Sequence, residues 1–278
     1  MDFSAVIRIP ELSAKLIERL FLLIILVKSA IVSEFGSNSI NNVMGNLVEY
    51  VNGQIWILEY PVQFLGMVLY ARTTIIKLPD GELLVHDPCK INETVKQEID
   101  ALGEVKYIIA PGNFHHLFVT DFQQYYPQAE TFLCPGLERK RSDISFDWIL
   151  GNRPDPRWGC VLEQVVVQGT KFIWEVAFFH KPSKTLILVD LLENIGDDFK
   201  HPVGITLRFW WKVIFKMWNN PKPAPEYQVG WGDKDKVKMA FNRILNWNAD
   251  RIILAHGELI EKDVNTVLQS AWKKVLNA

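Results

Sequence analysis

The stretch Tyr107-Ile-Ile-Ala-Pro-Gly-Asn-Phe-His-His-Leu-Phe118 joins a short apolar strand to a turn that carries two adjacent histidines, His115 and His116. Imidazoles at the ends of strands are common metal ligands. Two later strand-like runs end in a similar way, residues 184–190 on a carboxylate and residues 251–256 on an imidazole. We therefore expect three strands to deliver side chains of metal-ligand type at their C-terminal ends.

The composition is that of a globular protein, with 278 residues, 49% hydrophobic and 22% charged. The formal net charge of −2 and the lack of a nucleic-acid-binding signature predict no nucleic-acid partner. Three cysteines without a CxxC pair argue against a disulfide framework or a cysteine-rich zinc site. They favour a reducing compartment and predict a cytoplasmic location.

The N-terminal region differs from the rest of the chain. Residues 11–33 read as one apolar helix, and a Ser- and Asn-rich linker follows it. The apolar run 20–27 follows basic residues as in a secretory signal, but it reaches only about one-third of a bilayer-spanning length. We divide the chain into an N-terminal helix and linker, residues 1–45, and a folded domain, residues 54–278.

Within the folded domain, β character comes first and then alternates with helices. Short strands around a Pro79-Asp-Gly81 turn predict an antiparallel run. Periodicity and capping residues then predict helices over 92–102, 119–126, 204–219, 233–246 and 264–276, strands over 107–110, 131–134, 161–167, 172–180, 185–191 and 251–256, and an irregular excursion over 137–160.

The predicted hairpin also has a register. A four-residue loop over 181–184 pairs His180 with Thr185 and, counting outward, Glu175 with Asp190 on the same face. Two carboxylates placed in this way repel each other unless a cation lies between them or one of them is protonated. Glu175 therefore joins Asp190 as a candidate catalytic residue.

Other residues that could be functional have simpler structural explanations. His86 and His201 are lone histidines, which are usually hydrogen-bonded structural groups or surface residues. The segment 208–218 is rich in Trp and Lys, and as a helix it predicts either core packing with a solvated basic edge or a membrane-surface helix. Residues 11–33 and 208–218 are thus the candidates for peripheral membrane contact.

The order of these elements resembles the metallo-β-lactamase fold, and in particular an uncharacterised branch classed as a domain of unknown function. The resemblance covers about residues 54–278. It implies a mixed α/β, four-layer αββα sandwich with an N-terminal helical extension. It also implies a metal site along the edge where the two sheets meet, in agreement with the strand-end residues above.

The family motif His-x-His-x-Asp-His is altered in this sequence, where Pro111-Gly-Asn-Phe-His-His116 stands in its place. If His116 takes the last position, His115 falls where the family has Asp, and two family histidines are missing. Asp190 and His256 match their family positions. The resemblance thus implies a reduced, mononuclear site in which one Zn²⁺ or Fe²⁺ binds His115, His116, Asp190 and His256.

The resemblance also suggests roles for the surrounding residues. Asp190 would bind or orient a water, Glu175 would be a fifth ligand or general base, and Asp87 and Asn113 would support the ligands, Asp87 by accepting a hydrogen bond from a ligand imidazole. We predict a metal-dependent hydrolase that acts on an unidentified small molecule and has no organic cofactor. A catalytically inactive scaffold that acts as a binding or membrane-surface module is the alternative, and iron-dependent redox chemistry is a third interpretation.

Overall fold

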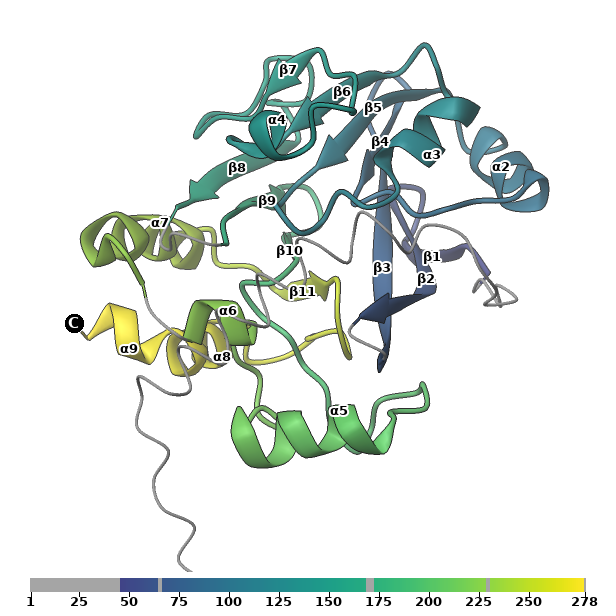
Figure 1. Ribbon diagram of the computed structural model, residues 1–278. Coiled ribbons are helices and arrows are strands. Elements are labelled where there is room, and N and C mark those ends of the chain that lie inside the picture. The colour runs from purple at the N-terminus through teal and green to yellow at the C-terminus, as the bar shows by residue number, and fades with distance from the viewer. Residues whose placement is uncertain (1–45, 65–66, 169–172, 229–230, 278) are drawn as a thin grey trace, which may run out of the picture. The chain divides into compact units, whose positions relative to one another are not determined.

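The computed structural model describes residues 46–64, 67–168, 173–228 and 231–277 (Figure 1). The chain divides into two units, Met1–Asn41 and Asn42–Ala278. Because the described residues begin at residue 46, the predicted helix over 11–33 and its linker lie outside them. Within the described part of the chain, none of the helices has the length and apolarity needed to cross a bilayer.

The larger sheet has seven strands, which follow one another in chain order. Its first four strands pair in antiparallel fashion, and from the fourth strand onward the pairing is parallel. The strands are β1 (Val48–Val51), β2 (Ile55–Phe64), β3 (Met67–Lys77), β4 (Leu83–His86), β5 (Val105–Ala110), β6 (Glu130–Leu133) and β7 (Trp148–Ile149).

The smaller sheet has four strands in the order β11-β10-β9-β8. Its members are β8 (Leu162–Val167), β9 (Glu175–His180), β10 (Thr185–Leu188) and β11 (Arg251–Leu254). His180 pairs with Thr185, as the predicted hairpin register has it, but the paired residues end at Ile187 and Phe178, so the predicted pair of Glu175 and Asp190 is not part of the ladder. Because β10 ends at Leu188, Asp190 lies beyond the ladder, in the loop at the C-terminal end of the strand.

Apolar side chains from both sheets form the central core, among them Leu84, Ile109 and Phe132 from the larger sheet and Phe178, Ile187 and Ile253 from the smaller. The outer faces are covered by helices (Figure 1). On the larger sheet these are α2 (Glu93–Asp100), α3 (Val119–Tyr125) and α4 (Leu137–Lys140), and on the smaller sheet α7 (Lys234–Asn246), α8 (Val264–Ala271) and α9 (Lys273–Leu276), with the short α6 (Pro225–Gln228) nearby. The predicted αββα sandwich is therefore confirmed.

Several elements differ from the sequence prediction. The irregular excursion over 137–160 contains α4 and β7, the predicted helix over 264–276 is divided at Trp272 into α8 and α9, and the predicted strand over 185–191 ends at Leu188. The apolar runs 66–70 and 73–78 predict two short strands, whereas residues Met67–Lys77 form one long strand, β3. Buried Arg72, between the two runs, lies directly opposite its partner Glu59 on β2 and so continues the strand. The predicted helix over 204–219 is shorter. It consists of α5 (Ile205–Phe209) and a π-helical turn, η1 (Trp210–Ile214), and it ends before Lys216, whose φ of 54° is left-handed.

We expect His180 to make stability depend on pH. Burial lowers the pKa of His180 to about 4, below the usual value near 6.5. The unfolded chain therefore binds the proton more readily, and stability should fall by on the order of 1–3 kcal/mol as pH falls from about 6.5 to 4. Urea unfolding across this pH range should show a steeper loss for the wild type than for His180→Gln. Parallel pH profiles for the two proteins would contradict the prediction.

Candidate metal centre

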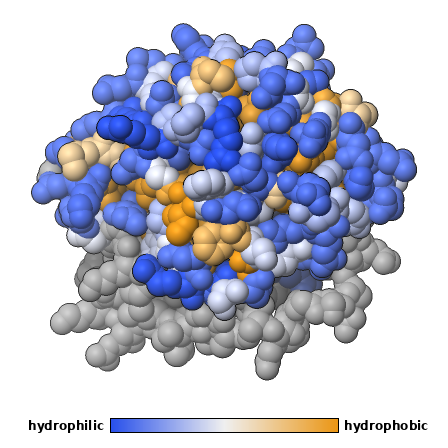
Figure 2. Space-filling model, turned by 90° about the horizontal axis from the view of Figure 1, so that it is seen from above, coloured by the Kyte–Doolittle hydropathy of each residue, from blue (hydrophilic) through white to orange (hydrophobic). Residues whose placement is uncertain are grey.

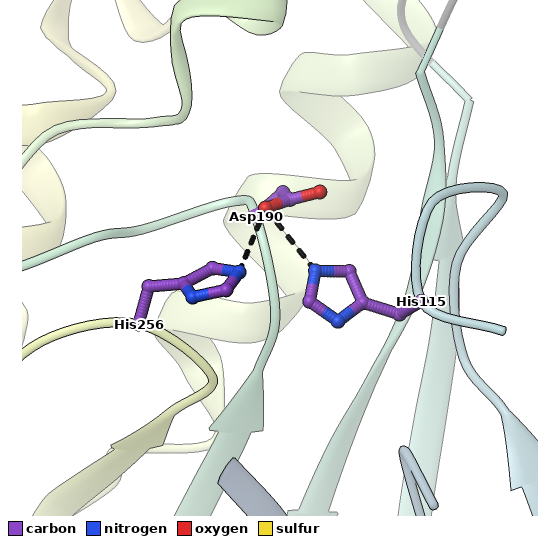
Figure 3. Close-up of side chains that lie close together, drawn as sticks. All are labelled: His115, Asp190 and His256. Carbon is purple, nitrogen blue, oxygen red and sulfur yellow. Dashed lines mark ion pairs between the residues drawn. The ribbon is translucent and has the colours of Figure 1, made fainter. Parts of the chain in front are cut away.

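Three ligand-type side chains, His115, Asp190 and His256, meet at the edge where the sheets end (Figure 3). We call them the His–Asp–His cluster. One donor atom from each lies within 4.8 Å of the others. The Nε2 atoms of His115 and His256 are 3.2 and 4.0 Å from the same oxygen, Oδ1 of Asp190. The residues follow β5, β10 and β11, so the C-terminal strand ends build the cluster.

His115 is oriented by Asp87, which follows β4. The Nδ1 atom of His115 lies 2.7 Å from Oδ2 of Asp87, so Nε2 is left to face Asp190. Burial alone favours a neutral ring, but the two carboxylates outweigh it and raise the pKa of His115 well above its usual value. Asp87 has a left-handed φ of 57°, and its carbonyl accepts a 2.6 Å hydrogen bond from the Thr73 hydroxyl.

His256 is oriented by a main-chain carbonyl. Its Nδ1–H donates to the carbonyl of Tyr70 at 2.9 Å, which places Nε2 toward the cluster. Burial and the nearby His115 lower the pKa of His256, so the ring is neutral. A neutral imidazole whose Nδ1–H is held by an oxygen acceptor is the form in which histidine binds metals.

The turn that carries His256 is fixed by two further residues. Gly257 has a φ of 93°, and a Cβ at this position would lie 2.1 Å from the carbonyl oxygen of Asn194, so only glycine fits. Buried Arg72 donates hydrogen bonds to the carbonyls of Leu254 and Gly257. The guanidinium therefore attaches β3 to both sides of His256.

Arg72 belongs to a larger buried network that the sequence prediction missed. Its guanidinium pairs with Glu59 at 2.6 Å, and the other Glu59 oxygen lies 2.8 Å from Nε2 of His201. The His201 ring stacks on Tyr70 with 3.7 Å between centroids. His201, set aside as a lone histidine, thus supports the residue that orients His256. An arginine within an apolar strand was the available signal, because buried charges need partners.

Glu175 supports the third member of the cluster. Its carboxylate accepts the backbone N–H groups of Val189, Asp190 and Leu191 at 3.0, 2.8 and 2.7 Å, and so holds the segment that presents the Asp190 side chain. Burial and the neighbouring charge of Asp190 raise the pKa of Glu175 to about 8. Two facing carboxylates need either a cation between them or a proton on one of them, and the raised pKa of Glu175 favours the proton.

The adjacent His116 lies outside the cluster. Its Nδ1 is 2.8 Å from the Arg141 guanidinium, which can only donate, so the ring proton must be on Nε2. Burial and the charges of Lys140 and Arg141 lower the pKa of His116 to about 3. As the side chains are arranged, neither nitrogen offers a lone pair to a metal. The structure therefore brings together three of the four predicted ligands.

Asn113 connects the histidine-bearing turn to the smaller sheet. Its side-chain oxygen accepts the Trp174 N–H at 3.1 Å, and its own N–H donates to the Trp174 carbonyl at 3.2 Å. The carbonyl of Asn113 in turn accepts a hydrogen bond from Lys140. Asn113 thus fixes the backbone that precedes His115.

We expect Glu175→Gln to lower the free energy of unfolding by about 1–3 kcal/mol, because an amide nitrogen cannot accept the backbone N–H that a carboxyl oxygen accepts. The matched control is Glu163→Gln on β8, where the pair with Arg243 is partly exposed and worth less than about 1 kcal/mol. Urea unfolding measures both. Equal effects would show that Glu175 does not hold the Asp190 segment.

We expect Arg72→Met to cost about 3–5 kcal/mol, since it leaves buried carbonyls and Glu59 without their cation. Arg243→Met, which removes an arginine of the partly exposed pair, should cost less than about 1 kcal/mol. The midpoints of urea unfolding compare the two variants. A loss for Arg72→Met as small as for Arg243→Met would contradict the anchoring role.

Comparison with protein families matches residues 52–142 to a family described as a domain of unknown function (DUF4336). The matched third of the chain includes Asp87 and both motif histidines, whereas Asp190 and His256 lie beyond it. None of the curated proteins matches the sequence.

Solved structures give a wider match. A metallo-β-lactamase from Pontibacter korlensis superposes with a TM-score of 0.55 at 13% identity over 84% of this chain and 99% of that one. FIM-1 from Pseudomonas aeruginosa, in its mono-zinc form, gives 0.52 at 10% identity over 83% and 96%. A metallo-β-lactamase from Hirschia baltica gives 0.52 at 10% identity over 83% and 97%. The chain therefore has the metallo-β-lactamase fold.

Proposed function

We propose that the chain is a metal-dependent hydrolase with a mononuclear site, in which His115, Asp190 and His256 hold one divalent cation. The observation that carries this proposal is the convergence of their donor atoms within 4.8 Å, with each imidazole turned inward by an acceptor on its Nδ1. Two imidazoles and one carboxylate fit catalytic Zn²⁺ and also non-haem Fe²⁺. The mono-zinc form of FIM-1 supports a single zinc in a protein of this fold.

A bound cation would supply a Lewis acid and a water that loses its proton near neutral pH. The protein residues supply the geometry. Asp87 holds the Nδ1 proton of His115, the Tyr70 carbonyl holds that of His256, and neither ring can rotate without losing this bond. We assign Asp190 as the third ligand and as the acceptor that orients the attacking water.

We assign Glu175 a positioning role instead of the general-base role suggested by the sequence. Its two oxygens already accept three backbone N–H groups, and this arrangement fixes the segment of Asp190. A carboxylate engaged in this way is oriented toward the protein backbone.

A second candidate function is that of a catalytically inactive scaffold. The observation in its favour is that His115 lies between Asp87 and Asp190, so a protonated ring compensates both carboxylates without a cation. In a hydrolase a cation must displace that proton. The two proposals therefore make opposite predictions about metal binding.

Metal content distinguishes them. We expect about one equivalent of zinc or iron in protein from metal-supplemented medium, loss of the metal in His256→Ala, and retention in His116→Ala, whose ring lies outside the cluster. Asp87→Asn should weaken metal binding about 10–100-fold, because it disturbs the acceptor of His115. Elemental analysis and competition with a chelator measure these effects.

Metal in both histidine variants would refute this ligand set, and a metal-free wild type would favour the scaffold. Hydrolysis is then tested on generic esters and phosphodiesters with the wild type and His256→Ala. Turnover that is lost with the metal supports the hydrolase. If the bound metal is iron and no substrate is hydrolysed, redox chemistry is the next activity to test.

A further inference from the structure

The helical segment formed by α5 and η1 carries apolar side chains on its solvent side. Ile205 is 86% exposed, Phe209 and Val213 are each 52% exposed, and Ile214 is 38% exposed. The spacing of four residues between the first three places them in one row. A surface helix normally turns charged and polar residues outward. Figure 1 shows α5 at the edge of the fold, away from the layers of helices that cover the sheets.

Figure 2 shows the molecule from above Figure 1, the face away from α5, with hydrophilic residues over most of the described surface and apolar residues in small groups between them. The opposite side of the α5–η1 segment is anchored in the protein. Leu207 and Trp211 are buried in a cluster with Leu69 of β3 and Ile195. The Trp211 indole N–H also donates to buried Glu193 at 3.1 Å. Packing in the core therefore explains one apolar face of the α5–η1 segment, and the exposed row is a second apolar face of the same segment.

The charge of this region is one-sided. Residues 199–225 contain five basic residues and no Asp or Glu, although the whole chain has a net charge of −2. Arg208 and Lys212 are exposed on the helix beside the apolar row. Burial, together with the charges of Lys274 and Lys216, lowers the pKa of Lys222. Asp197 is the acidic partner, 3.2 Å from Arg208.

We propose that α5 and η1 form a membrane-docking helix, which lies in the surface of an anionic bilayer with Ile205, Phe209 and Val213 inserted and the flanking basic residues at the headgroups. A single exposed row with basic neighbours suits the plane of a bilayer, where apolar side chains enter by about 5–10 Å. Anionic headgroups complement the excess of lysine and arginine. The proposal does not depend on the metal site.

Docking also has a structural connection to the candidate site. The buried side of the helix packs on Met67 and Leu69 of β3. The next residue of that strand, Tyr70, supplies the carbonyl that orients His256. A protein docked through this helix would thus hold the β3 side of the His–Asp–His cluster close to the bilayer.

The test is flotation of the full-length protein with two kinds of vesicle, pure phosphatidylcholine and phosphatidylcholine with about 30% phosphatidylserine. We expect the wild type to float with the anionic vesicles. A Phe209→Ser, Val213→Ser double variant should lose at least about tenfold in vesicle partitioning. A Lys212→Gln, Lys216→Gln double variant should lose about 20-fold at low salt.

The matched control is Met239→Ser, because Met239 is an apolar residue on α7 that is 66% exposed. Its partitioning should equal that of the wild type within about twofold. Circular dichroism and thermal melting of every variant confirm that the folded state is retained.

Three results would overturn the proposal. If the Phe209→Ser, Val213→Ser variant floats as well as the wild type, membrane binding belongs to another segment, such as residues 1–45. Equal flotation with both kinds of vesicle would remove the anionic surface as the partner. Absence of flotation, together with an oligomer that the same variant dissociates in light scattering, would show that a second copy of the chain covers the row.

Discussion

The ion-paired contact of His115 with Asp87 and Asp190 is the interaction on which the candidate site depends. All three side chains are buried, and buried charges are costly unless they are paired. His115 lies between two carboxylates that come from different sheets, after β4 and after β10. Without the imidazole, two like charges would face each other across the sandwich. Their shared partner, His115, therefore connects the two sheet edges through one buried side chain.

The other two members of the cluster are held by separate buried contacts. Asp190 is positioned through the backbone, because Glu175 accepts three consecutive N–H groups of its segment. His256 is positioned from the opposite side by the Tyr70 carbonyl and by Arg72, which donates to the carbonyls around it. Each of the three side chains thus has its own support, and such supports are what a preorganised metal site would require.

The π-helical turn and the apolar row show how the same fold can present a second surface. Trp211 and Leu207 keep the segment attached to β3, and its outer residues remain exposed. The carbonyl of Trp211 accepts the N–H of Met217 and of Trp218, which explains why the predicted long helix stops early. Trp211 therefore both ends the helix and anchors it in the protein. The exposed row of the α5–η1 segment is thus held in a fixed orientation relative to the β3 edge.

The order of most strands and helices, and the kind of side chain at each strand end, follow from the sequence alone, whereas the layered sandwich followed from the resemblance to a known fold. Short apolar runs, the Asn92 cap of the helix predicted over 92–102 and the four-residue hairpin loop are local features, so the order of neighbouring residues is enough to predict them. Which of the two adjacent histidines joins the cluster depends on contacts that form in the folded protein. His115 and His116 are chemically identical, and their roles differ because Asp87 accepts from one and Arg141 donates to the other. Arg72 and Gly257, 185 positions apart, likewise meet only when the two sheets stack, which no local pattern in the chain can specify.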